Sequence, residues 1–188
     1  MGASAGGLTA VSTILARLPA DFAIAIAVVQ HRAKQSELLA TLLQDSTKLK
    51  VVEVEDKQPI GPGYVYVAPP DYHLLIDQGT FALSTDDLVL YSRPSIDVFF
   101  DSAADAYGPG TVGVVLTGAN SDGSKGLKKI VERGGQAFVQ DPATAEVNVM
   151  PAAAHALVPR ARVASLEGIA DHLLRMNEVQ LRQVATPS

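Results

Sequence analysis

The chain opens on Met1-Gly2-Ala3-Ser4-Ala5-Gly6-Gly7, a serine among small residues that leads directly into an apolar-periodic segment. Small residues let the backbone turn sharply and let a ligand approach closely. The stretch from Gly2 to Gly6 fits the Gly-x-Ser-x-Gly pattern of a nucleophile elbow, which presents a serine hydroxyl at a tight turn. Taken alone, it also fits a phosphate-binding loop before a helix or a plain tight turn. A nucleophile would need a base and an acid from elsewhere in the chain.

Outward from this stretch, helical and strand patterns alternate. Apolar residues at helical spacing predict a helix over 8–18, and the continuous apolar run 22–29 predicts a strand buried on both faces. This alternation indicates an α/β domain with a mainly parallel sheet. Two segments around Gln78-Gly79, 73–77 and 80–84, predict an antiparallel β-hairpin. The other expected elements are helices over 38–43 (Ser36 as N-cap, Glu37 in the first turn), 96–107 (capped by Ser95), 125–133, 151–157 and 166–176 (capped by Ser165), and strands over 50–54, 64–68, 111–116 and 136–140.

Composition bounds the class of protein. The chain has 188 residues, 47% of them hydrophobic and 19% charged, which suits one globular domain with a core. Its net charge of -5 offers no basic surface for nucleic acid, and the lack of cysteine excludes disulfides and thiolate chemistry. The apolar run 22–29 is too short to span a bilayer, and no secretory signal is evident. We therefore expect no nucleic-acid binding, no membrane insertion and a cytoplasmic location.

Three polar residues are predicted at the carboxyl ends of strands, where functional groups of such sheets gather. Ser4 precedes the first helix, His31 follows the strand over 22–29, and Asp122 follows the strand over 111–116. They are the parts of a catalytic triad, with Ser4 as nucleophile, His31 as general base and Asp122 holding the imidazole. Each alone is more typical of an ordinary loop or turn residue, so the hypothesis depends on their conjunction. Backbone N–H groups near Gly118 and Ala119 could form an oxyanion hole.

Other chemistries fit the sequence less well. An α/β-hydrolase would use Ser4, Asp122 and His155 in that order, but His155 lies in an alanine-rich helix pattern. The segment 118–125 only partly resembles a Walker A loop, because Ser124 separates Gly123 from Lys125. No dinucleotide fingerprint and no metal-ligand spacing is present, so we expect no cofactor and no metal.

Five ordered motifs make the chain resemble the catalytic domain of the CheB family of chemotaxis protein-glutamate methylesterases, from Gly2 to about Met176. The motifs are Gly2-Ala3-Ser4-Ala5-Gly6-Gly7, Val28-Val29-Gln30-His31, Tyr66-Val67-Ala68-Pro69, Arg93-Pro94-Ser95-Ile96-Asp97-Val98-Phe99-Phe100 and Leu116-Thr117-Gly118-x-x-x-Asp122-Gly123-x-x-Gly126, and Gln140-Asp141 and Met150-Pro151 continue the match.

The resemblance implies a doubly wound parallel sheet with helices on both faces and a β-hairpin. It implies a catalytic domain over 1–176 with a polar tail over 177–188, and the same triad of Ser4, His31 and Asp122. The implied reaction is hydrolysis of glutamate methyl esters on chemoreceptor helices, releasing methanol, with glutamine deamidation as a further activity. Implied partners are the cytoplasmic helices of methyl-accepting receptors and a receiver domain or signalling-fusion module.

The sequence departs from the family pattern near the nucleophile. The family usually has an apolar strand before Gly-Ala-Ser, whereas only Met1 precedes Gly2 here, so we expect a truncated first strand. Ala5 stands where a threonine is common. A second hypothesis is therefore a catalytically weak module of the same fold that docks receptor or kinase partners. Arg93, next to a Pro-Ser cap, could contact an acidic receptor helix or simply be a solvated surface residue.

Overall fold

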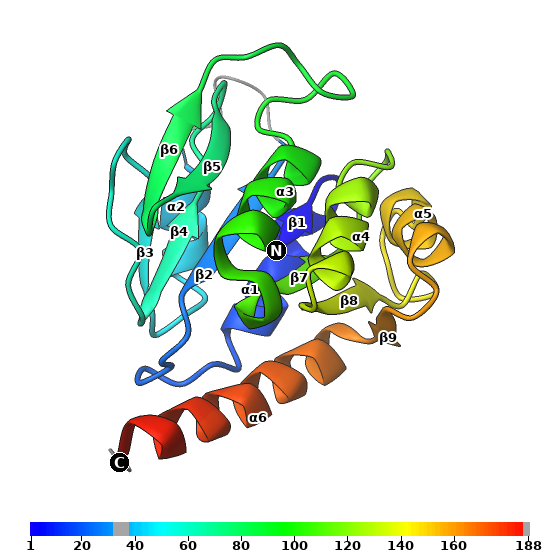
Figure 1. The fold of residues 1–188 in the computed structure, drawn as a ribbon. Coiled ribbons are helices and arrows are strands. Elements are labelled where there is room, and N and C mark those ends of the chain that lie inside the picture. The colour runs from blue at the N-terminus through cyan, green and yellow to red at the C-terminus, as the bar shows by residue number, and fades with distance from the viewer. Residues whose placement is uncertain (32–37, 186–188) are drawn as a thin grey trace.

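The computed structural model describes residues 1–31 and 38–185, and side chains as far as residue 182. A seven-stranded, wholly parallel sheet has the strand order β3-β4-β2-β1-β7-β8-β9, and a separate antiparallel pair joins β5 to β6 (Figure 1). In chain order the elements are β1 (Gly2–Ala3), α1 (Gly7–Leu15), β2 (Ile26–Gln30), α2 (Leu39–Gln44), β3 (Lys50–Glu53), β4 (Tyr64–Val67), β5 (His73–Asp77), β6 (Thr80–Ser84), α3 (Ile96–Tyr107), η1 (Gly108–Gly110), β7 (Val112–Val115), α4 (Ser124–Glu132), β8 (Gln136–Gln140), α5 (Val149–Leu157), β9 (Arg162–Ala164) and α6 (Leu166–Ala185).

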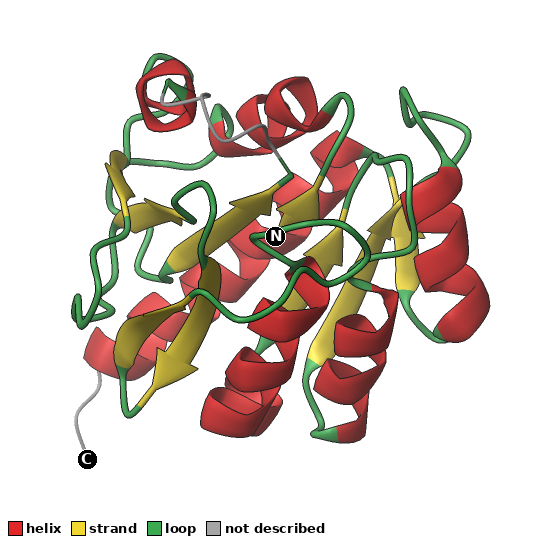
Figure 2. Cartoon of the chain, turned by 90° about the horizontal axis from the view of Figure 1, so that it is seen from above, coloured by secondary structure: helices red, strands yellow, loops and turns green. Residues whose placement is uncertain are grey.

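Helices cover both faces of the sheet, and Figure 2 shows the strands between them. Neighbouring residues of a strand point to opposite faces, so each central strand supplies both cores. In β2, Val28 packs in the core that α1, α2 and α6 complete, and Val29 packs in the core that α3, α4 and α5 complete. This explains why the strand reads as an uninterrupted apolar run. The prediction of a doubly wound, mainly parallel sheet with a hairpin is confirmed.

Several element bounds differ from the sequence-based expectations. The strand expected over 22–29 is β2 and begins only at Ile26, and the helix expected over 8–18 is α1 and ends at Leu15. The hairpin strands and the helix that Ser95 caps lie where they were expected. The last helix was expected to end at Met176, but α6 continues to Ala185, so the polar segment is helical to that point. The short edge strand β9 was not predicted. The expected N-cap at Ser36 and the first-turn residue Glu37 lie outside the described residues. No helix in the described ranges is long and apolar enough to cross a membrane.

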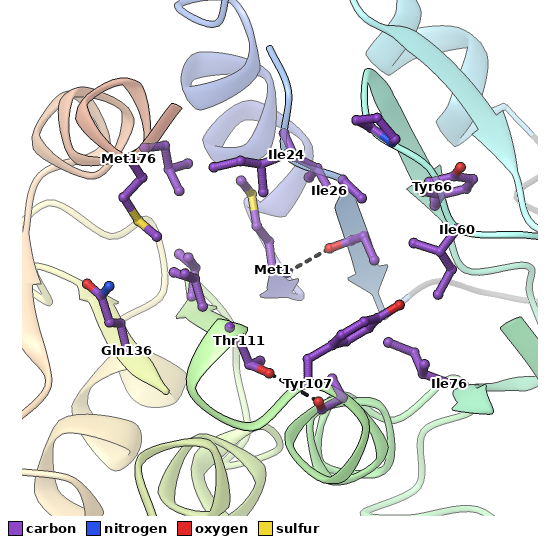
Figure 3. Close-up of a pocket in the computed structure, with 18 of the residues that line it drawn as sticks. Met1, Ile24, Ile26, Ile60, Tyr66, Ile76, Tyr107, Thr111, Gln136 and Met176 are labelled. Atoms are coloured by element: carbon purple, nitrogen blue, oxygen red, sulfur yellow. Dashed lines mark hydrogen bonds between the residues drawn. The ribbon is translucent and has the colours of Figure 1, made fainter. Parts of the chain in front are cut away.

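The first strand has two residues. β1 consists of Gly2–Ala3 and lies between β2 and β7, where Gly2 pairs with Val29 on one side and Val115 on the other. In line with β1, at the end of the sheet opposite Ser4, lies a cavity of about 810 Å³ lined largely by apolar side chains (Figure 3). The Met1 amine donates to the carbonyl of Ala27 over 2.7 Å, and burial lowers the pKa of this amine to about 5.

Candidate active site

Ser4 lies in the tight turn that joins β1 to α1. Its N–H donates to the carbonyl of Thr117 over 2.9 Å, and its carbonyl accepts from the Gly7 N–H and from Gln30 Nε2, each over 2.8 Å. Gly6 has a φ of 75°, which glycine adopts without strain. At Gly7 a Cβ would lie 2.7 Å from the Ala3 Cβ, so the turn requires glycine there. The small residues therefore hold Ser4, half-buried, at the carboxyl end of the sheet.

His31 follows the neighbouring strand at the same end of the sheet. Ala3 and Gln30, the last residues of β1 and β2, pair with each other, and the His31 N–H donates to the Ala3 carbonyl over 3.0 Å. Ser4 and His31 therefore each directly follow one of two adjacent strands. The His31 side chain is only 10% exposed, and its Nε2 lies 2.7 Å from Oδ2 of Asp122. The predicted base and acid are therefore in direct contact beside the predicted nucleophile.

Asp122 is fully buried and surrounded by hydrogen-bond donors. Its Oδ2 accepts from the Ile96 N–H over 2.7 Å, and its Oδ1 accepts from Ser95 Oγ and the Asp97 N–H, each over 2.9 Å. These donors belong to the first turn of α3, whose N-terminus favours a negative charge. Burial alone would raise the pKa of Asp122, but the hydrogen bonds from His31 and from the Asp97 and Ile96 N–H groups outweigh it and lower the pKa. The carboxylate is therefore ionised and fixed in place.

The contact with Asp122 fixes the tautomer of His31. An ionised carboxylate only accepts hydrogen bonds, so Nε2 carries the proton and Nδ1 carries the free lone pair. Nδ1 lies 3.3 Å from the hydroxyl oxygen of Ser92, which donates to it. Within the described parts of the chain, no hydrogen bond joins Ser4 Oγ to the imidazole. Nδ1 is thus the basic atom of the site, and Ser92 is a neighbour that the sequence did not indicate.

The three other predicted site residues differ in what they can do. The Gly118 N–H donates to the Val147 carbonyl over 3.0 Å, so it is not available as an oxyanion donor. Ala119 is exposed, and its N–H makes no hydrogen bond to any described residue. Arg93 Nη2 and Nε donate to Asp71 Oδ1 over 2.7 and 3.1 Å, and its Nη1 donates to two backbone carbonyls, those of Thr85 and Asp86. The guanidinium of Arg93 therefore anchors the loop before α3.

The remaining histidines have other environments. His73 is buried, with Nε2 on the Asp87 carbonyl at 2.9 Å and Nδ1 accepting from the Ser95 N–H at 3.1 Å. His155 lies on α5, and its Nδ1 is buried without a partner among the described residues. Asp122 contacts His31, and no hydrogen bond connects it to His155 in the described structure. Nor do any three histidine or carboxylate side chains of the described residues gather as a metal site.

Two residues of the site were missed or only partly foreseen. Ser95 was predicted as a helix N-cap, and its Oγ does accept from the Val98 N–H over 3.4 Å, but the same hydroxyl donates to Asp122. A Ser-x-Asp start of a helix gives no hint of this second contact. Ser92 has no motif of its own, and only the fold of the loop 85–93 brings it to His31.

Comparisons with known proteins agree with this architecture. The family model described as CheB methylesterase matches residues 1–173. A Leptospira interrogans protein named "putative protein-glutamate methylesterase/protein-glutamine glutaminase" is 48% identical over 97% of this chain and 96% of its own length. The protein-glutamate methylesterase FrzG of Myxococcus xanthus is 39% identical over 87% of this chain, which spans about half (51%) of that protein. The crystal structure of the CheB methylesterase catalytic domain of Thermotoga maritima superposes with a TM-score of 0.89 at 34% identity, over 93% of this chain and 95% of that one. The chain belongs to the CheB methylesterase family.

Proposed function

We propose that the protein is a serine hydrolase that removes methyl groups from glutamate methyl esters of chemoreceptors, with Ser4, His31 and Asp122 as its catalytic triad. The observation that carries the proposal is the 2.7 Å contact between His31 and the buried Asp122 at the strand ends beside Ser4. The names of the relatives support a glutamate methyl ester of a protein as the substrate, and those that pair a methylesterase with a protein-glutamine glutaminase support deamidation of protein glutamines as a second reaction.

The proposed reaction is acyl transfer in two steps. Ser4 Oγ attacks the ester carbonyl while Nδ1 of His31 takes its proton, and Asp122 stabilises the imidazolium that forms. The tetrahedral intermediate collapses, the carbon–oxygen bond to methanol breaks, and His31 returns the proton to the departing methoxide. Water, deprotonated by His31, then attacks the acyl-enzyme. The bond between the acyl carbon and Ser4 Oγ breaks, His31 returns the proton to Ser4 Oγ, and the glutamate side chain leaves as a carboxylate. The reaction thus needs a free lone pair on Nδ1 of His31, and the contact with Asp122 keeps the proton on Nε2.

Two backbone groups support the developing oxyanion in this proposal. The Ala5 N–H follows the nucleophile, the position that supplies an oxyanion donor in nucleophile elbows. Neither it nor the Ala119 N–H makes a hydrogen bond to a described residue. Such preorganised donors contribute most when charge develops on the carbonyl oxygen. Ala119 therefore remains a proposed donor, whereas Gly118 contributes through its close approach to Ser4.

The alternatives receive less support. A catalytically weak docking module would not need a buried carboxylate held by His31 and by the start of α3, and the relatives carry the names of enzymes. An α/β-hydrolase that used His155 as its base would need contact between His155 and Asp122. The receptor substrates imply a cytoplasmic location and, as partners, cytoplasmic receptor helices and a receiver domain or signalling-fusion module.

Methanol release from a methylated receptor fragment tests the proposal. We expect turnover by the wild type, and its loss in Ser4→Ala and His31→Ala. His155→Ala is the matched control for the base and should retain turnover. Full turnover by His31→Ala, or loss of turnover in His155→Ala with the fold intact, would contradict the assignment of the base.

A further inference from the structure

We propose that Ser92 is a positioning residue of this reaction, whose hydroxyl caps Nδ1 of His31 in the substrate-free enzyme and must leave before Ser4 can be deprotonated. The proposal rests on the proposed function, because it gives Ser92 a role relative to the base of the triad. Its starting observation is the 3.3 Å contact between Ser92 Oγ and His31 Nδ1.

The chemistry of a neutral imidazole makes the two serines alternatives. Nδ1 has one lone pair in the plane of the ring, so it accepts one well-aligned hydrogen bond at a time. Asp122 occupies the other nitrogen and holds the proton there. A donor at Nδ1 is therefore either Ser92, as in this structure, or Ser4, as the reaction requires. In this proposal the two hydroxyl groups replace one another at Nδ1, while Nε2 keeps its contact with Asp122.

The two contacts of His31 differ in strength. The 2.7 Å bond to Asp122 is short and charge-assisted, which makes it the durable contact of the ring. The 3.3 Å contact to Ser92 is longer than a typical O–H hydrogen bond, so it is the weaker of the two. Rotation about χ1 of Ser92 is enough to break it, with no movement of the backbone. The geometry thus combines a fixed orientation of the ring with an exchangeable cap on the base.

The backbone of Ser92 is held in place by the surrounding loop. Its N–H donates to the Val89 carbonyl over 2.9 Å, and its carbonyl accepts from the Val89 N–H over 3.2 Å. The next residue, Arg93, is tied to Asp71 and to the carbonyls of Thr85 and Asp86. The loop is therefore anchored on both sides of its tip, and the position of the Ser92 Cβ relative to His31 is set by these contacts.

The fixed loop explains what the cap contributes. The His31 side chain is only 10% exposed, and the Ser92 hydroxyl is its neighbour at Nδ1. A hydroxyl on a fixed backbone keeps the lone pair occupied until a substrate is bound productively. The cap lowers the fraction of free enzyme in which Nδ1 can accept the proton of Ser4, and the apparent dissociation constant of the substrate rises in proportion.

Steady-state kinetics and ¹⁵N NMR of Ser92 variants test this inference. Removal of the competing hydroxyl in Ser92→Ala should raise kcat/KM for methanol release about fivefold, the factor expected for a hydrogen bond of typical net strength. Ser92→Thr keeps a hydroxyl and should remain close to wild type. Ser121→Ala is the matched control, because Ser121 is exposed on the loop before Asp122 and its hydroxyl bonds to no described residue. Urea unfolding of each variant shows whether its fold is retained.

The ¹⁵N signal of His31 Nδ1, measured without substrate, is the readout that a purely structural role would not change. In Ser92→Ala it should move toward the position of a ring nitrogen that accepts no protein hydrogen bond, and Ser92→Thr should restore it. An unchanged signal, or an unchanged or lower kcat/KM in a folded Ser92→Ala protein, would overturn the inference while leaving the proposed function intact. Turnover that survives Ser4→Ala would instead refute the proposed function.

Discussion

Asp122→Asn tests the buried carboxylate with almost no change of volume. Oδ2 accepts from His31 Nε2 and the Ile96 N–H, and Oδ1 accepts from the Asp97 N–H and, over 3.1 Å, from the Gly123 N–H. An amide has only one oxygen, so either the donors at the Oδ1 position or the donors at the Oδ2 position must lose their acceptor. With the amide nitrogen at the Oδ1 position, two backbone N–H groups are orphaned. With it at the Oδ2 position, only the Ile96 N–H is orphaned, because His31 can reverse its tautomer and accept from the amide.

The second arrangement costs less and defines the expected result. One buried N–H without an acceptor costs about 1–3 kcal/mol, so the free energy of unfolding should fall by about 2 kcal/mol. The reversed tautomer places the imidazole proton on Nδ1 of His31, the atom that must take the proton of Ser4. The equivalent change in a serine protease lowers kcat by about 10⁴-fold, and we expect a loss of that order here.

Methanol release and urea unfolding of Asp122→Asn measure the two effects. Asp97→Asn is the matched control. Burial is the main cause that raises the pKa of Asp97, and the neighbouring charge of Asp122 raises it further. Oδ1 of Asp97 accepts from the Gly126 N–H over 2.8 Å, a hydrogen bond that an amide oxygen can keep. The control should retain both kcat and stability. A folded Asp122→Asn protein whose kcat falls by less than about a hundredfold would refute the reasoning from the tautomer.

Two further predictions follow from the packing and hydrogen bonds of the described residues. A Cβ at Gly118 would lie 2.9 Å from the Ser4 Cβ and 2.6 Å from Met150 Cε, so Gly118→Ala should displace Ser4 and lower kcat by about tenfold or more. Gly110→Ala is the control, because a Cβ there would meet nothing within 4 Å, and it should keep the wild-type kcat. Equal kcat values in the two variants would show that the close approach of Gly118 to Ser4 does not matter for catalysis. Arg93→Ala removes the contacts of the guanidinium with Asp71 and with the carbonyls of Thr85 and Asp86, so the free energy of unfolding should fall by about 1–3 kcal/mol. KM for the receptor fragment should stay unchanged. A large rise in KM would assign Arg93 to substrate binding instead.

The sequence predicted those parts of the molecule that depend on local pattern. The run 22–29 indicated a strand buried on both faces, and Gln78-Gly79 located the hairpin turn, because periodicity and turn chemistry act over a few residues. The convergence of Ser4, His31 and Asp122 could be expected because the carboxyl ends of parallel strands meet at one edge. Their catalytic roles remain a prediction.

Other features depend on tertiary contacts that no local pattern encodes. The capping of Nδ1 by Ser92 requires the path of the whole loop 85–93, and the commitment of the Gly118 N–H to Val147 requires the segment before α5 to pack against this turn. Arg93 looked free to meet a substrate because the sequence does not show that Asp71 lies beside it. The extension of α6 to Ala185 was missed because residues 178–182 are exposed and pack in neither core, so burial against the domain does not set the end of the helix.

The activation of Ser4 is the central claim, and a fluorophosphonate probe tests it most directly because it labels only activated serines. Intact-mass and peptide analysis of the labelled wild-type protein should show one adduct, located on Ser4, and no adduct in Ser4→Ala or His31→Ala. A wild-type protein that takes no label, or that carries it on Ser92, would contradict the account.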